Sequence, residues 1–168
     1  MFHLFSPIHA IDSDTVKRIY KLSCDIIELI TTIDGNRNIA EYGPTFVTKH
    51  LHVPAIAILR IARSHLEDQI DVKRGQNAYF AMITYHRKHA VRPDDAFARF
   101  SIILAQLWTS SQIFRTPSGN IDSLRVRSRN RLGMSIVYDC FWWWRQEFGG
   151  QVDVFDNNEG MSTVVFPQ

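Results

Sequence analysis

The stretch Asp94–Arg115, which reads DDAFARFSIILAQLWTSSQIFR, gives the clearest indication of the fold. Its apolar residues recur every three or four positions, as expected for one face of an α-helix. Asp94 is the predicted N-cap, and Asp95 lies in the first turn, where the helix dipole favours a carboxylate. The helix should end near Arg115, because residues 116–120 (TPSGN) have the composition of a loop. The residues that should face the core are Phe97, Phe100, Leu104, Leu107, Trp108 and Ser111.

The N-terminal half shows the same helical period. A first helix is predicted to begin at the cap candidates Asp12 and Ser13 and to end before Gly35. Residues 44–64 are apolar on nearly all sides, which predicts a helix buried at the centre of a bundle. Pro54 should kink that helix, because proline removes a backbone hydrogen bond.

Three more helices complete the predicted fold, over about residues 72–89, 122–131 and 135–148. Long helices joined by short connections are typical of helix bundles. We therefore expect an all-α fold, an irregular bundle of about six helices with a mobile acidic C-terminal tail. Residues 1–148 should form one domain and residues 149–168 the flexible tail.

Composition limits the classes of function. A chain of 168 residues with 45% hydrophobic residues is long enough and apolar enough to bury one core. The net charge of +2 is too small to indicate a polyanionic partner, and no apolar run is long enough to cross a membrane, so no membrane partner is expected. Cys24 and Cys140 should be free thiols of a protein in the nucleus or cytosol.

Candidate catalytic and metal-binding residues are few. His50 and His52 would project about 200° apart on a helix and cannot share a metal ion there. His86 and His89 have a better spacing for zinc, but no further ligand follows on that helix. Motifs for phosphate binding or an activated nucleophile are absent from the sequence. We therefore expect neither an enzyme nor a bound cofactor or metal ion.

The arginines after residue 114 form a basic segment. If residues 122–131 are helical, Arg125 and Arg129 lie on one side of the line through Leu124 and Ser128, and Arg127 and Arg131 on the other. Three uses of these charges remain open: bracing of neighbouring helices, docking of an acidic protein segment, and contact with nucleic acid phosphates. The last is the least favoured, because the segment lacks interleaved aromatic residues.

The helix predicted over residues 135–148 carries three consecutive tryptophans, Trp142, Trp143 and Trp144. At 100° per residue, one core-facing stripe cannot bury all three indoles. Trp144 belongs to that stripe. Trp142 or Trp143 is therefore predicted to be substantially accessible to solvent, to bind a partner and to promote self-association.

Four motifs in order resemble one known family: DDAFAR (94–99), LAQLW (104–108), RVRSR (125–129) and SIVYDCFWWWR (135–145). This order resembles the end of the fungal-specific regulatory domain of binuclear zinc cluster transcription factors. The segment YGPTFV (42–47) also fits, so that the resemblance covers roughly residues 4–148. It implies the C-terminal part of a helical regulatory domain that acts in transcription regulation in the nucleus.

The resemblance also implies partners. Such domains contact other proteins or the rest of the same factor, and some sense small-molecule effectors. The family's DNA-binding module holds two zinc ions with six cysteines, whereas this chain has two cysteines. Specific DNA binding and zinc are therefore expected only in a module outside this chain. The alternative is a small all-α ligand-binding protein or enzyme whose site is not visible in the sequence.

Overall fold

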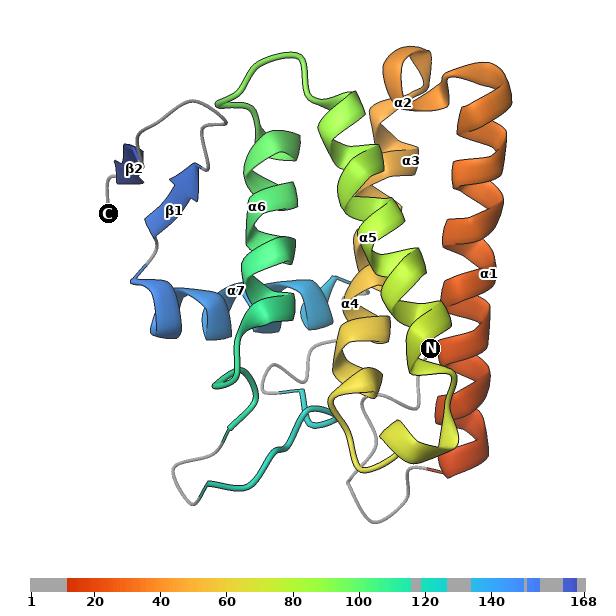
Figure 1. The fold of residues 1–168 in the computed structure, drawn as a ribbon, viewed down its shortest axis with the longest axis vertical. Helices are drawn as coiled ribbons and strands as arrows, with labels where there is room; N and C mark the ends of the chain where they lie inside the picture. Colours follow the sequence, from red (N-terminus) through yellow and green to blue (C-terminus); the bar gives the residue numbers. More distant parts are fainter. Residues whose placement is uncertain (1–11, 116–118, 127–133, 150, 155–161, 166–168) are drawn as a thin grey trace.

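The computed structural model describes residues 12–115, 119–126, 134–149, 151–154 and 162–165, and these are mainly α-helical (Figure 1). This confirms the all-α fold with an irregular bundle of helices. The helices are α1 (Ser13–Arg37), α2 (Ile39–Tyr42), α3 (Thr45–His50), α4 (His52–Ala62), α5 (Val72–His89), α6 (Ala96–Thr109) and α7 (Ser135–Phe148), with a 3-10 turn at Glu67–Gln69.

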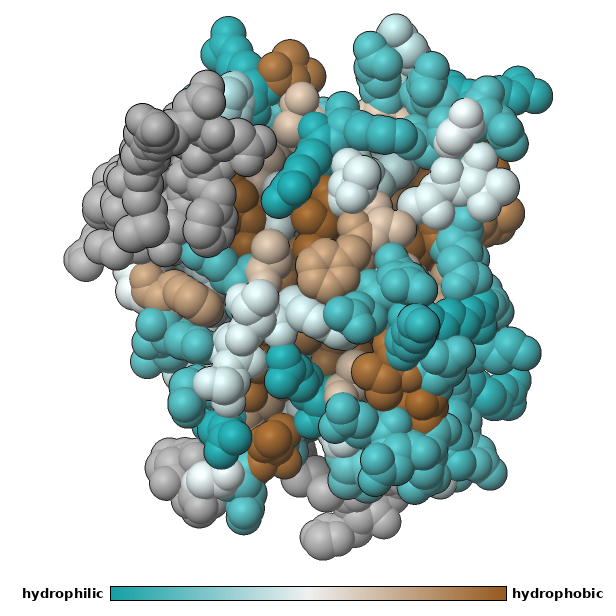
Figure 2. Space-filling view, viewed as in Figure 1, coloured by the Kyte–Doolittle hydropathy of each residue, from teal (hydrophilic) through white to brown (hydrophobic). Residues whose placement is uncertain are grey.

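Helix α4 forms the centre of the bundle. All its residues from Val53 to Ala62 are buried. Helices α1, α5 and α7 pack against it, and α6 packs against α5. Figure 1 shows α1 at one edge of the molecule and α7 crossing the others at a steep angle. In Figure 2, hydrophobic residues appear mainly in the seams between helices, and hydrophilic residues cover the outer edges.

Helix α1 begins as predicted, but it ends later. The side chain of Asp12 accepts a hydrogen bond from the backbone N–H of Asp14 at 3.2 Å, which caps the first turn. The helix passes through Gly35 and stops where Asn38 adopts a left-handed conformation with φ of 50°. Asn38 closes the helix because asparagine tolerates this conformation better than most residues.

The predicted central helix is divided into two. Helix α3 ends at His50 and α4 begins at His52, so that the break lies at Leu51, three residues before Pro54. Pro54 has no N–H to donate to the carbonyl of His50, and its ring excludes that carbonyl from the helical position. The predicted effect of Pro54 is therefore present, displaced by about one turn.

Helix α6 is shorter than predicted. Its N-cap is Asp95, not Asp94: the Asp95 carboxylate accepts from the N–H groups of Phe97 and Ala98 at 2.9 and 2.8 Å. The helix ends at Thr109, six residues before the predicted end. The hydroxyl of Ser110 then accepts from the N–H groups of Gln112 and Ile113, which begins a separate turn.

The helix predicted over residues 122–131 is wrong for its described part. Residues 122–126 form no helix, and Ile121 pairs with Arg115 in an isolated antiparallel bridge. Residues 127–133 lie outside the described part of the chain. The backbone carbonyls of residues 123 and 125 are hydrogen-bonded to the side chain of Arg60 instead of to a helical turn.

The last helix agrees with the prediction: α7 spans Ser135–Phe148 and ends at Gly149, whose φ is 62°. Two short strands follow, β1 (Gln151–Val154) and β2 (Ser162–Val165), paired antiparallel with Gln151 opposite Val165. The sequence analysis did not predict them. Residues 150, 155–161 and 166–168 lie outside the described residues, and the mobility of the tail stays a prediction.

Candidate functional site

The four predicted arginines are not seen together. Arg125 lies on the extended segment after the Ile121 bridge, with its side chain exposed and its Nη1 atom 3.9 Å from Asp122 Oδ2. Arg127, Arg129 and Arg131 lie outside the described residues. The helical arrangement of the four residues proposed from sequence therefore fails at its first residue, while the binding role of the basic segment stays a prediction.

The tryptophans of α7 are distributed as one core stripe requires. Trp144 is buried, and its indole Nε1 donates to Gln106 Oε1 at 2.8 Å. Trp142 and Trp143 are both partly buried, with their ring centroids 5.1 Å apart. Trp143 also contacts the ring of Phe114 at 6.1 Å. The substantial exposure predicted for Trp142 or Trp143 is thus reduced to partial exposure.

A buried arginine, which the sequence analysis missed, ties three parts of the fold together. Arg60 lies in α4 with no exposed side-chain surface. Its Nε donates to the carbonyl of Ser123 at 2.7 Å, its Nη2 to that of Arg125 at 2.6 Å, and its Nη1 to Asp139 at 2.7 Å. Its guanidinium carbon also lies 4.7 Å from the centre of the Phe114 ring. The signal in the sequence is a single charge inside an otherwise apolar helix.

The buried His86 and the half-buried His52 form a second polar cluster, between α4, α5 and α6. The rings of His52 and His86 are 4.9 Å apart, and Phe100 packs against both. Neither ring nitrogen of His86 has a hydrogen-bond partner, nor has Nε2 of His52. Burial lowers the pKa of His86 to about 2 and that of His52 to about 4, with nearby histidines and Lys49 adding to the effect. Both imidazoles are therefore neutral at pH 7.

The described residues contain no group of three metal-ligand side chains. His89, the candidate partner of His86 for a zinc ion, places its Nδ1 against the carbonyl oxygen of Ala40. The thiols of Cys24 and Cys140 are free and buried, and burial raises the pKa of each to about 11. These side chains are therefore protonated at pH 7 and poor nucleophiles.

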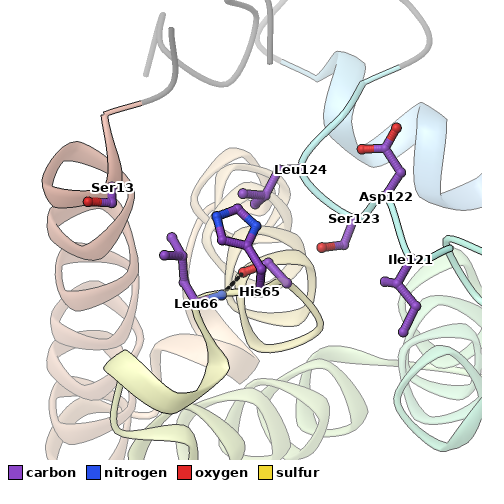
Figure 3. A pocket seen from close by; sticks show the side chains of 8 residues that line it. Ser13, His65, Leu66, Ile121, Asp122, Ser123 and Leu124 are labelled. Carbon is purple, nitrogen blue, oxygen red and sulfur yellow. Dashed lines mark hydrogen bonds between the residues drawn. The ribbon is translucent and has the colours of Figure 1, made fainter. Parts of the chain in front are cut away.

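A small pocket of about 120 Å³ lies between the first turn of α1, the end of α4 and residues 121–124 (Figure 3). It collects Ser123, His65 and Asp122, residue types used in nucleophilic catalysis. The Ser123 hydroxyl has no hydrogen-bond partner, so no base contacts it. In Figure 3 the Asp122 carboxylate lies on the far side of Ser123 from the His65 ring. The arrangement is not that of an activated serine.

A second and wider concave surface is an apolar groove of about 680 Å³ between α1 and the α3–α4 corner. We call it the α1–α3 groove. His50 is its one polar lining residue among those described, and His50 Nδ1 already contacts the carbonyl of Phe46 at 2.7 Å. The size lies in the range of binding sites. The groove is lined by Ile26, Leu29, Ile30, Ile33, Phe46, Val47, His50, Leu51, Val53, Pro54 and Met134.

Sequence analysis did not single out this groove. Its residues come from two predicted helices and from Met134, and only the packing of these parts shows which apolar side chains remain uncovered. Comparison with protein-family models, curated proteins and solved structures found no match for this chain. Among the described residues, no helix is long and apolar enough to cross a membrane.

Proposed function

We propose that this chain is a non-catalytic regulatory and interaction module, part of a fungal zinc cluster transcription factor that acts in the nucleus, and that the α1–α3 groove is its contact surface. The observation that carries the proposal is the groove itself. Leu29 on one wall and Phe46 on the other are large apolar side chains left exposed at a concave surface. Apolar surface of this kind marks contact sites.

The chemistry of the described residues supports a binding role over a catalytic one. The buried charged side chains of Arg60 and Asp139 are paired with each other. The buried histidines are surrounded by aromatic rings rather than by an open cavity. The α1–α3 groove offers apolar contact and one imidazole, which suits recognition of an apolar surface and provides no acid–base pair.

The order of motifs quoted from the sequence supports the transcriptional context. Of the four motifs, DDAFAR lies at the start of α6, LAQLW lies within α6, and SIVYDCFWWWR lies in α7. DNA recognition is assigned to a module outside this chain, as are the zinc ions. The partner is another protein surface or another part of the same factor.

A reporter assay tests this function. The chain is fused to a DNA-binding domain that has no regulatory activity of its own, and reporter expression is measured in a fungal host. We expect the fused chain to change expression relative to the DNA-binding domain alone. Leu29→Glu and Phe46→Glu should remove most of that change, because each places a charge in the groove.

Val91→Glu is the matched control, because Val91 is exposed and does not line the groove. It should behave as the unchanged chain does. Equal reporter expression with and without the fused chain would contradict the regulatory role. A change in expression that Leu29→Glu and Phe46→Glu leave intact would exclude the groove as the contact surface.

A further inference from the structure

Helix α1 has two apolar stripes, and one of them is buried in the core while the other is partly exposed. The buried stripe contains Val16, Tyr20, Cys24 and Ile27. The second stripe lies about 120° around the helix axis at 100° per residue. We call it the outer stripe, and its residues follow one another at intervals of three and four: Ile19, Leu22, Ile26, Leu29 and Ile33.

The order of residue types in the outer stripe is specific. Isoleucine occupies the three positions seven apart, and leucine occupies the two positions between them. In the heptad notation these are Ile at a and Leu at d, the combination that favours two parallel helices packed side by side. A stripe that faced water alone would have no reason to alternate β-branched and γ-branched residues in this register.

The outer stripe borders the α1–α3 groove. Ile26, Leu29 and Ile33 belong to both, so that each copy of the chain presents a ridge beside a hollow. A surface that carries both shapes can pack against itself about a two-fold axis, as homodimer interfaces do. Phe46 of α3 forms the far wall of the hollow and extends the apolar surface.

The exposed area is of the size that a weak dimer needs. The exposed fractions are 55% for Leu22, 47% for Ile26, 62% for Leu29 and 63% for Phe46. At about 150 Å² for each large apolar side chain when fully exposed, these four residues present roughly 340 Å² per copy. With about 60% of an interface apolar, two copies would bury roughly 1,100 Å² in total, near the lower limit for specific complexes.

We propose that the occupant of the α1–α3 groove is a second copy of this chain, with the two α1 helices packed along their outer stripes in a homodimer of micromolar affinity. The inference rests on the proposed function in that both assign the α1–α3 groove as a contact surface, and it names a second copy of the chain as the partner. It assigns self-association to α1, which lies at one edge of the molecule (Figure 1), and not to the tryptophans of α7.

Sedimentation velocity over about 1–200 μM of the full chain tests the proposal. We expect a reversible monomer–dimer equilibrium. Leu29→Glu should be monomeric at every concentration. Its far-ultraviolet circular dichroism spectrum should be unchanged, because Leu29 is exposed in the monomer and its replacement does not disturb the fold. Leu29→Ala should weaken the dimer about tenfold, because the contact is lost in both copies.

Tyr138→Glu is the matched control, because it places the same charge at an exposed aromatic residue of α7. It should dimerise as the unchanged chain does. A chain that is monomeric throughout the range overturns the proposal, and so does a dimer that survives Leu29→Glu or that Tyr138→Glu abolishes.

The reporter assay separates this proposal from the proposed function. If the chain is monomeric in solution while Leu29→Glu still abolishes its effect on the reporter, the groove is a contact surface for a different partner. If the dimer forms and Leu29→Glu abolishes it without any effect on the reporter, the dimer stands and the regulatory role of the groove fails.

Discussion

The guanidinium of Arg60 and the carboxylate of Asp139 lie 2.7 Å apart, and both side chains are excluded from solvent. The two residues are 79 positions apart in the sequence, and their ion pair joins the central helix α4 to α7. Arg60 also donates to the carbonyl oxygens of Ser123 and Arg125 and, at 3.7 Å, to Cys140 Sγ. A buried ion pair is tolerated when its other hydrogen bonds are satisfied in this way.

Removal of one partner should therefore be costly. Asp139→Asn keeps the size of the side chain and removes its charge, which leaves the buried Arg60 unpaired. We expect the free energy of unfolding to fall by about 3 kcal/mol or more, measured by urea denaturation. Asp122→Asn, at the exposed pair with Arg125, should change it by less than about 0.5 kcal/mol. Equal effects of the two substitutions would contradict the central role of Arg60.

Two glycines inside helices should respond in opposite directions to alanine. A Cβ at Gly75 would lie 1.8 Å from the hydroxyl of Tyr20, which donates to the carbonyl of Asp71. A Cβ at Gly35 would meet nothing within 4 Å. In thermal or urea unfolding, Gly75→Ala should destabilise by about 1–3 kcal/mol and Gly35→Ala should stabilise by about 0.5–1 kcal/mol. Stabilisation by both would show that Tyr20 does not pack against Gly75.

The buried histidines predict a loss of stability in mild acid. The pKa values of His52 and His86 in the fold, about 4 and about 2, lie below the ordinary value of 6.5. Below pH 6.5 the unfolded chain therefore binds protons at these histidines that the folded chain does not bind, so the free energy of unfolding falls as the pH drops. For His52 the fall continues to about pH 4, and for His86 it continues towards about pH 2. Between pH 7 and pH 5 the two residues should together lower the free energy of unfolding by roughly 2–4 kcal/mol.

His86→Phe should reduce this acid sensitivity by about half, because phenylalanine fills the same space without titrating. The control is His65→Gln, because His65 is exposed. It should leave the dependence on pH unchanged. Urea denaturation at pH 7, 6 and 5 measures the difference, and equal slopes for His86→Phe and the unchanged chain would refute the assignment.

We also expect the isolated chain not to bind DNA specifically. Its two cysteines are buried and free, so they cannot form the zinc cluster of the family that the sequence resembles. Fluorescence anisotropy at physiological salt should show only weak binding that fades as salt is added. Sequence-dependent affinity in the nanomolar range would contradict this expectation.

Helical periodicity was sufficient to place most of the bundle. The bounds predicted for α5 and α7 agree with the structure, because Asp71 caps α5 and Gly149 ends α7, and both are local signals. The end of α6 was placed too late, because apolar residues continue past Thr109 in a separate turn. Periodicity records that residues are apolar, but it does not record where the chain leaves the helix.

Contacts between residues that are distant in the sequence could not be predicted from the sequence pattern. Residues 122–126 have the composition of a helix, yet Arg60, more than 60 positions away, takes their carbonyl oxygens. The α1–α3 groove was not predicted for a related reason. Packing against α4 and α5 decides which apolar residues of α1 are covered, and Leu22, Ile26 and Leu29 remain exposed.

Arg60 holds the segment around Leu124 by main-chain atoms alone. Every amino acid supplies the same carbonyl oxygen, so the outward side chains of this segment can be exchanged without weakening its attachment. Arg125 is one such position: its carbonyl is bound while its side chain is exposed. The backbone of this segment is therefore held in place whatever its exposed side chains are. Substitutions at its exposed positions can change the binding specificity of the surface with little loss of stability.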